Sequence, residues 1–145
     1  MKYTIAFALL AIVSIGFASC SNETTSPYMS QLPTPVQSVI NDNFSAQVLS
    51  ATTEANTFGI DEYEIILADG TKVSFAGEEW DEVEVPAGQS VPDYFVIEPI
   101  RVYVSEKMPD QTIVKIERNK KGYEIELSNK MEINFDNNGA FISVD

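Results

Sequence analysis

The sequence predicts an α+β protein made of two tandem repeats, each with a short helix packed on an antiparallel sheet of about four strands. Two segments opened by proline carry apolar residues four positions apart, which is the spacing of an amphipathic helix. Each is followed by short segments in which apolar and polar residues alternate between turns that contain Gly or Asn, as in antiparallel strands. The same order of elements occurs in both halves of the chain, which indicates an internal duplication.

The segment before the repeats has the layout of a signal peptide. An apolar run over residues 5–17 is too short for a membrane-spanning helix, so residues 1–19 are predicted to be a signal peptide. The small residues before Cys20 resemble the lipobox of bacterial lipoproteins, which implies acylation of Cys20; an ordinary signal peptide with a chance cysteine is the alternative. Residues 20–31 are polar and aperiodic, which predicts a flexible tether. We therefore expect a lipid-anchored protein of the bacterial cell envelope, on the periplasmic side or at the cell surface.

The first repeat is predicted to span residues 32–85. Its helix, residues 32–44, carries Val36, Ile40 and Phe44 on one face, with Thr34 as N-cap and Pro35 at the first helical position. The Asp69-Gly70 pair marks a hairpin turn. The predicted strands are residues 46–53, 62–68, 71–75 and 80–85.

Residues 86–97 are predicted to be a linker, because Pro, Gly and Ser gather in a stretch without an apolar period. The second repeat then spans residues 98–145. Its helix, residues 98–108, places Ile100, Val104 and Met108 four apart. The predicted strands are residues 111–118, 123–127, 131–135 and 140–144.

The two halves also match residue by residue. The segment Tyr63-Glu64-Ile65 corresponds to Tyr123-Glu124-Ile125, and further apolar positions follow at the same interval. These positions are Leu67 with Leu127, Val73 with Ile133, Phe75 with Phe135 and, after a one-residue gap, Trp80 with Phe141 and Val83 with Val144. Each half is too small to be stable alone, so we expect the two to share a core or to join their sheets.

This repeated unit resembles the PepSY-like modules of small exported bacterial lipoproteins. The resemblance is carried by Tyr63-Glu64-Ile65, Asp69-Gly70, Val73, Phe75, Trp80 and Val83 after a helix opened by proline, and it recurs less cleanly from Tyr123 to Val144. The doubled arrangement also resembles the fold of the beta-lactamase inhibitor protein. The resemblance implies two helix-plus-sheet repeats joined into one concave sheet, and binding or inhibition as the class of activity. That inhibitor is disulfide-bonded and this chain has a single cysteine, so its target is not carried over.

The composition excludes several function classes. The formal net charge of −13 at pH 7 repels the phosphate backbone, so nucleic-acid binding is not expected. The chain has no histidine and one cysteine, which excludes Ser-His-Asp and Cys-His catalysis and the usual zinc sites. Paired carboxylates such as Glu62 and Glu64 lie on an exposed strand, and no predicted pocket would raise the pKa of either. We therefore expect a protein that is not an enzyme.

An antiparallel sheet covered by helices on one side leaves its other face open to solvent. We expect the helices to cover the face that carries Tyr63, Ile65, Leu67, Val73, Phe75, Ile125, Leu127, Ile133 and Phe135. Alternation places several glutamates on that open face, Glu117 and Glu132 among them, which makes it either a solvated surface or a recognition surface. The candidate partner-binding residues are Glu62, Glu64, Glu82, Glu124 and Glu126.

Trp80 is predicted to lie on the same open face, because Val83 and Val85 are expected to point inward. Phe141 is its counterpart in the second half. An exposed Trp among acids suits the anchor of a protein or peptide partner. The alternative is a β-bulge that returns both rings to the core.

Two acidic loops, residues 78–82 and 136–139, contain oxygen ligands of the kind that calcium prefers, with Asp136 and Asn138 as candidate ligands. Neither loop has the spacing of an EF-hand, and Asp136 and Asn138 also suit a tight turn.

The predicted function is a non-catalytic envelope module that binds, and inhibits or senses, a protein or peptide. The alternatives are a calcium-responsive or small-ligand-binding envelope protein and, third, a structural spacer. Apart from calcium, no cofactor is expected.

Overall fold

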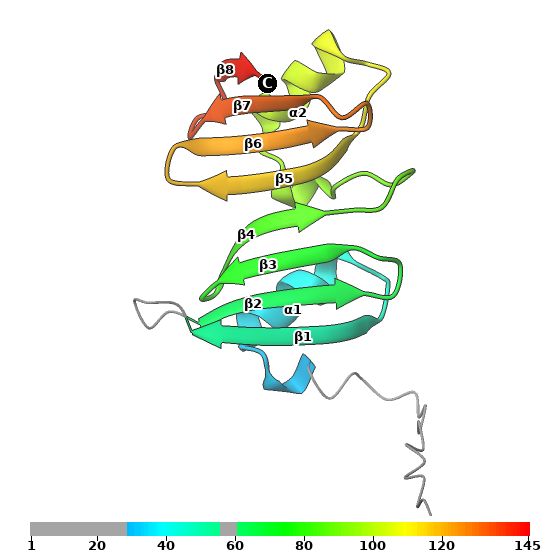
Figure 1. The fold of residues 1–145 in the computed structure, drawn as a ribbon, viewed down its shortest axis with the longest axis vertical. Coiled ribbons are helices and arrows are strands. Elements are labelled where there is room, and N and C mark those ends of the chain that lie inside the picture. Colours follow the sequence, from blue (N-terminus) through cyan, green and yellow to red (C-terminus); the bar gives the residue numbers. More distant parts are fainter. Residues whose placement is uncertain (1–28, 56–60) are drawn as a thin grey trace, which may run out of the picture.

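A computed structural model describes residues 29–55 and 61–145. The predicted signal peptide, Cys20 and most of the predicted tether lie outside the described residues. Within them, two α-helices and two short 3-10 helices accompany one open antiparallel sheet of eight strands in sequential order (Figure 1). The elements are η1 (Met29–Gln31), α1 (Thr34–Asn43), β1 (Val48–Ala55), β2 (Asp61–Leu67), β3 (Lys72–Ala76), β4 (Glu79–Glu84), η2 (Asp93–Phe95), α2 (Glu98–Lys107), β5 (Ile113–Asn119), β6 (Gly122–Leu127), β7 (Glu132–Asp136) and β8 (Phe141–Val144). The predicted α+β class is confirmed.

Both α-helices lie on the same face of the sheet (Figure 1). In α1, the spacing of four buries Val36 and Ile40, and in α2 it buries Ile100 and Val104. A proline in the first turn of each helix fits the N-terminus, where its missing N–H has no intrahelical acceptor. The predicted cap at Thr34 is wrong by one position, because the helix begins at that residue and Pro33 precedes it. Within the described residues, no helix is long and apolar enough to span a membrane.

The core lies between the helices and the sheet. Alternation along the strands predicts the inward side chains correctly, because all nine of the predicted positions are buried. They are Tyr63, Ile65, Leu67, Val73, Phe75, Ile125, Leu127, Ile133 and Phe135. Full burial of one such aliphatic side chain contributes roughly 1.5–3 kcal/mol, so this face supplies most of the driving force for folding.

The two halves of the chain meet where β4 pairs with β5. Val83 lies opposite Ile116 and Glu84 lies opposite Lys115 in this antiparallel pair. The four strands that follow α1 and the four that follow α2 therefore belong to one sheet, with β1 and β8 as its two outer strands.

Residues 86–97 are more than the linker that their composition predicts. Val91, Phe95 and Val96 are buried, and the Val91 N–H donates to the Ile113 carbonyl oxygen at 2.8 Å. The Phe95 ring stacks on Phe44 with a centroid separation of 5.6 Å. This irregular segment thus fills the core between the halves. A similar correction applies to the end of the predicted tether, because Met29 is 6% exposed and begins a 3-10 helix.

Candidate functional site

The open face of the sheet carries an uninterrupted row of polar residues across all eight strands. The pairings place the residues of this row directly opposite one another, strand by strand. In order from β1 to β8 they are Thr52, Glu64, Ser74, Glu82, Glu117, Glu124, Asn134 and Ser143. We call this the acidic row. Three of its glutamates lie side by side on β4, β5 and β6, where the two halves of the sheet join.

A second row on the same face mixes charges of both signs. From β2 to β7 it contains Ile66, Lys72, Glu84, Lys115, Glu126 and Glu132. We call it the mixed row. Lys72 lies 3.8 Å from Glu84, and Lys115 reaches into the acidic row, where its Nζ lies 3.2 Å from a carboxylate oxygen of Glu82. The mixed row therefore has two lysines against three glutamates, and among the described residues only the Lys72–Glu84 pair lies within the row.

The acidic row keeps more negative charge than its neighbours compensate. Among the described residues, the ion pairs of this face use Glu82, Glu84 and Glu126, the last with Lys130 at 2.7 Å, but not Glu117 or Glu124. Burial, followed by the charges of Glu117 and Glu132, raises the pKa of the Glu124 carboxyl above its usual range. Like charges directly opposite on neighbouring strands are destabilising. The face thus presents negative charge that a cation would neutralise.

The negative charge of the acidic row also acts on Lys115, whose side chain is positive. Partial burial acts to lower the pKa of its ammonium group, but the hydrogen bond to Glu82 and the charges of Glu82, Glu117 and Glu84 outweigh burial and raise it. The ammonium group therefore remains charged and held by the acids around it.

Asp81, which the sequence pattern places only within the acidic loop 78–82, is a further acidic residue of this face. One of its carboxylate oxygens, Oδ1, is buried and has no hydrogen-bond partner among the described residues. Burial, with the charges of Glu82 and Glu62, raises the pKa of this carboxyl. Asp81 helps to line a polar cavity of about 280 Å³ that also includes Thr52, Glu54, Glu62, Glu64 and Ser74. The predicted site residues Glu62 and Glu64 are thus brought together with a carboxylate that has one oxygen without a hydrogen-bond partner.

The structure places Trp80 on the helix-covered side, not on the predicted open face. A β-bulge between β3 and β4 sets Glu82 opposite Ser74 and Trp80 opposite Phe75, so Asp81 is an extra residue in β4. Because side chains alternate along a strand, the extra residue moves the side chains of the residues before it to the opposite face of the sheet. The prediction that Trp80 shares a face with Glu82 is therefore wrong, and the alternative of a bulge is correct.

Trp80 takes part in an aromatic cluster between the halves. Its ring makes an edge-to-face contact with Phe95 at a centroid distance of 5.3 Å. The guanidinium carbon of Arg118 lies 4.8 Å from the ring centroid, and Arg118 donates hydrogen bonds to the Trp80 carbonyl oxygen and, at 2.9 Å, to a Glu79 carboxylate oxygen. Tyr94 and Tyr123 also line a groove at this place. This arrangement joins β4 to β5 and stabilises the junction.

Phe141 follows the same rule in the second half. A bulge between β7 and β8 sets Phe141 opposite Phe135, again on the helix side. Its ring stacks on Tyr103 of α2 with a centroid distance of 5.3 Å and an interplanar angle of 8°, yet 46% of Phe141 is exposed. The two predicted aromatic anchors therefore lie away from the predicted glutamates.

The Asp136 turn has a structural explanation. The Asp136 Oδ1 oxygen accepts the backbone N–H groups of Asn138 and Ala140, both at 2.8 Å, and Gly139 has a positive φ of 79°. An Asx-type turn of this kind accounts for both residues proposed as calcium ligands. Within residues 29–55 and 61–145, no group of three or more His, Cys, Asp or Glu side chains is arranged to hold a metal ion.

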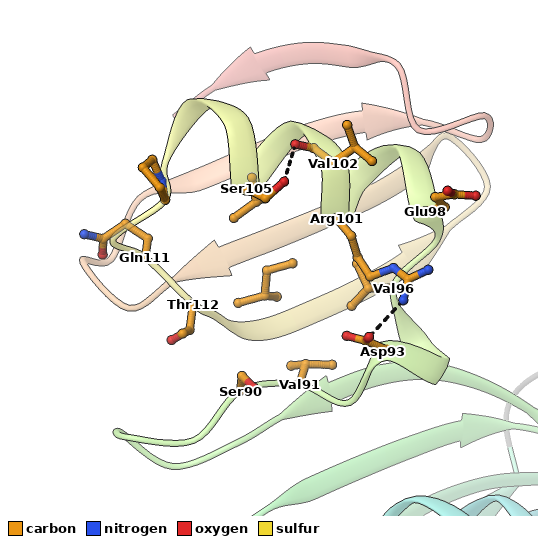
Figure 2. A pocket seen from close by; sticks show the side chains of 13 residues that line it. Ser90, Val91, Asp93, Val96, Glu98, Arg101, Val102, Ser105, Gln111 and Thr112 are labelled. Carbon is orange, nitrogen blue, oxygen red and sulfur yellow. Dashed lines mark hydrogen bonds and ion pairs between the residues drawn. The ribbon is translucent and has the colours of Figure 1, made fainter.

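A larger groove of about 530 Å³ lies on the helix side, between α2, the segment before it and the start of β5 (Figure 2). Arg101 and Asp93 form an ion pair of 2.9 Å across it, as the dashed line in Figure 2 shows. Both charges are thereby compensated. The groove contains none of the site residues that the sequence predicted.

Comparisons with known proteins agree with this architecture. Residues 61–143 match the model of a family described as "Putative beta-lactamase-inhibitor-like, PepSY-like". No curated protein is significantly similar to the chain.

Three similar solved structures come from Bacteroides species. One, described as a "putative periplasmic protein of unknown function" from Bacteroides vulgatus ATCC 8482, is 34% identical, with 81% of this chain and 94% of that chain covered and a TM-score of 0.76. Another, a "putative calcium-regulated periplasmic protein" from Bacteroides thetaiotaomicron, is 36% identical over 81% of this chain and 92% of that chain, with a TM-score of 0.74. A third, a "putative periplasmic protein from DUF2874 family" of Bacteroides vulgatus ATCC 8482, is 34% identical over the same shares, with a TM-score of 0.74.

Proposed function

Since the chain belongs to the PepSY-like, beta-lactamase-inhibitor-like family, we propose that it is a non-catalytic envelope protein that binds a basic segment of a protein or peptide on the open face of its sheet. Inhibition or sensing of that partner would follow from the binding. The similar solved structures are described as periplasmic proteins and not as enzymes, which supports both the envelope location and the class of activity.

The observation that carries this proposal is the acidic row. Glu82, Glu117 and Glu124 lie opposite one another on three neighbouring strands, so their carboxylates gather at the centre of the sheet. A chain of Lys or Arg side chains laid across these strands would neutralise charges that now repel one another. A net charge of −13 would also attract such a segment from a distance.

Binding of a fluorescent Lys/Arg-rich peptide, followed by anisotropy, tests the proposal. We expect the double variant Glu82→Gln/Glu124→Gln to weaken binding about tenfold, since exposed charge pairs contribute up to about 1 kcal/mol each. The double variant Glu98→Gln/Glu106→Gln is the matched control, because it also removes two charges and both residues are exposed glutamates of α2 on the other side of the molecule. Equal losses in both variants would reduce the effect to net charge and contradict a site on the open face. A peptide with Gln in place of Lys and Arg should not bind.

A calcium-responsive protein is the second candidate, because one similar structure is described as calcium-regulated. Asp136 and Asn138 are the residues proposed for this role. If calcium binds there, millimolar calcium will raise the melting temperature above the value in magnesium, and Asp136→Ala will abolish that rise. Equal melting temperatures in the two ions would discard this candidate.

We also propose that Cys20 is acylated and that it anchors the protein to a membrane. The residues before it support this, as does the location of the similar structures. Mass spectrometry of the N-terminal peptide would detect the acyl groups. Cys20→Ala should move the protein out of the membrane fraction, and a variant that stays there would contradict the anchor.

We infer, finally, that the two halves are tandem repeats. A 3-10 helix precedes both α-helices, and bulges occur at corresponding places in β1 and β5 and in β4 and β8. Superposition of residues 34–84 on residues 98–144 should align α1 and β1–β4 with α2 and β5–β8, strand for strand. A bulge at a different place in one half would contradict the duplication.

A further inference from the structure

Exposed apolar side chains gather on the two outer strands of the sheet. Six large hydrophobic residues of the described chain are exposed, and four of these lie on β1 or β8, which form the opposite edges in Figure 1. They are Leu49, with 59% exposed, and Phe141, Ile142 and Val144, with 46%, 56% and 46% exposed. Edge strands usually avoid this pattern, because unpaired backbone groups beside apolar side chains invite pairing with another chain.

The outer strand β8 occupies the same place in its half as β4 does in the other. Each lies beside the third strand of its half and has a bulge directly after its aromatic residue, which is Trp80 in β4 and Phe141 in β8. Val144 lies opposite Ile133 as Val83 lies opposite Val73. Val83 is fully buried, because β5 continues the sheet beside it, whereas no strand of the described residues lies on that side of Val144.

The outer strand β1 likewise corresponds to β5. The register shifts between Val48 and Ser50 in β1 and between Ile113 and Lys115 in β5, in each case opposite the end of the next strand. Leu49 therefore corresponds to Val114, which is 8% exposed and whose carbonyl oxygen accepts the Val85 N–H at 2.9 Å. The outer strands β8 and β1 thus correspond to β4 and β5, which already pair with each other inside the molecule.

We propose that β8 of one copy of this chain pairs with β1 of a second copy, antiparallel and head to tail, as β4 pairs with β5. Val83 opposite Ile116 becomes Val144 opposite Ala51, and Glu82 opposite Glu117 becomes Ser143 opposite Thr52. The like-charged pair of the internal junction is replaced by a neutral polar pair. Glu54 is the one charged residue of the two strands, so these edges are the part of an acidic molecule where a second copy meets little repulsion.

Such an interface is heterologous, because different surfaces of the two copies meet. It leaves one β1 and one β8 free at the ends of every assembly, so further copies can add. This distinguishes it from a symmetric dimer in which β8 pairs with β8 and the assembly closes.

Cross-linking of two different cysteine variants tests the pairing. In a full-length chain with Cys20→Ser, we expect a Ser143→Cys protein mixed with a Thr52→Cys protein to form disulfide-linked pairs faster than either protein alone. Glu106→Cys, on α2, is the matched control and should not cross-link with either. Faster cross-linking of the Ser143→Cys protein with itself would overturn the head-to-tail arrangement in favour of a symmetric one.

Sedimentation velocity of the wild-type chain supplies an independent measurement. We expect the weight-average mass to rise with concentration beyond that of a dimer, and Val144→Lys to weaken this association about tenfold. A wild-type chain that remains monomeric up to about millimolar concentration would overturn the proposal and leave the β8 edge for an extended segment of another protein. Circular dichroism would confirm that each variant is folded, as expected for substitutions at exposed or partly exposed positions.

Discussion

Trp80→Ala measures how much the aromatic junction contributes to stability. Truncation of a fully buried Trp costs 3–5 kcal/mol, and Trp80 is only partly buried, so loss of packing should cost roughly 2 kcal/mol. The edge-to-face contact with Phe95 and the cation–π contact with Arg118 add roughly 0.5 kcal/mol each or somewhat more. We therefore expect a loss of about 3 kcal/mol in the free energy of unfolding.

Chemical denaturation with far-UV circular dichroism measures this loss, and a thermal melt should show a fall of about 10 °C for a domain of this size. Phe141→Ala is the matched control. Phe141 is the counterpart of Trp80 at the outer strand and 46% exposed, with its ring stacked on Tyr103, so its truncation should cost about 1 kcal/mol. If Trp80→Ala costs no more than Phe141→Ala, the ring does not stabilise the junction and the reasoning from the bulge is refuted.

Three further substitutions test other parts of the structure. Gly122→Ala should lower the free energy of unfolding by at least about 3 kcal/mol, because φ is +143° and a Cβ atom would overlap the Phe135 carbonyl oxygen. Gly88→Ala is the control for this substitution. Gly88 has φ +90° and open space around it, so the change should cost only about 1 kcal/mol in the same denaturation assay. Asp81→Asn should raise the melting temperature at neutral pH, because a pKa raised above the usual value of 3.8 means that the ionised carboxylate destabilises the folded protein. This gain in melting temperature should shrink as the pH falls from the raised pKa toward 3.8. A gain that does not depend on pH would contradict the raised pKa. Glu117→Lys should stabilise the free protein by about 0.5–1 kcal/mol and weaken binding of the basic peptide at least tenfold. Lower stability would show that the glutamates of the acidic row do not repel one another. Unchanged binding would show that the acidic row does not bind the peptide.

The inward face of the sheet could be predicted from the sequence because burial there depends on local alternation. Tyr63, Ile65 and Leu67 occupy alternate positions, and a strand of any register would place them on one side. The helix faces follow from an equally local spacing. Residues 86–97 could not be predicted in this way, since Val91 and Phe95 are buried in an irregular segment whose apolar residues have no period.

The position of Trp80 shows where local alternation fails. A prediction that assumes strict alternation of side chains along a strand cannot detect the extra residue at Asp81. A signal was nevertheless present, because Trp80 and Val83 are three apart, as are Phe141 and Val144. Two apolar residues an odd number of positions apart at the start of a strand predict a bulge when both must be buried.

The acidic row depends on register across the junction, which the sequence alone does not determine. Its glutamates could be assigned to the open face one strand at a time, but their order across β4, β5 and β6 requires the pairing of Glu82 with Glu117. Of the predicted site residues, Glu64, Glu82 and Glu124 lie in this row. Glu117 is not among the predicted site residues, because its place beside Glu82, which belongs to the other half of the chain, depends on this pairing.

The acidic row is also a place where the sheet gives up stability. Like charges opposite one another are destabilising, and a lysine in place of Glu117 would relieve its repulsion with both Glu82 and Glu124. The fold does not require acids at these positions, because the neutral residues Ser74 and Asn134 occupy the same row on other strands. A basic segment bound across the row would remove the repulsion, so the free energy that the free protein loses there becomes part of the free energy of binding. This is why the row, and not the aromatic junction, is the part of the sheet best suited to recognition.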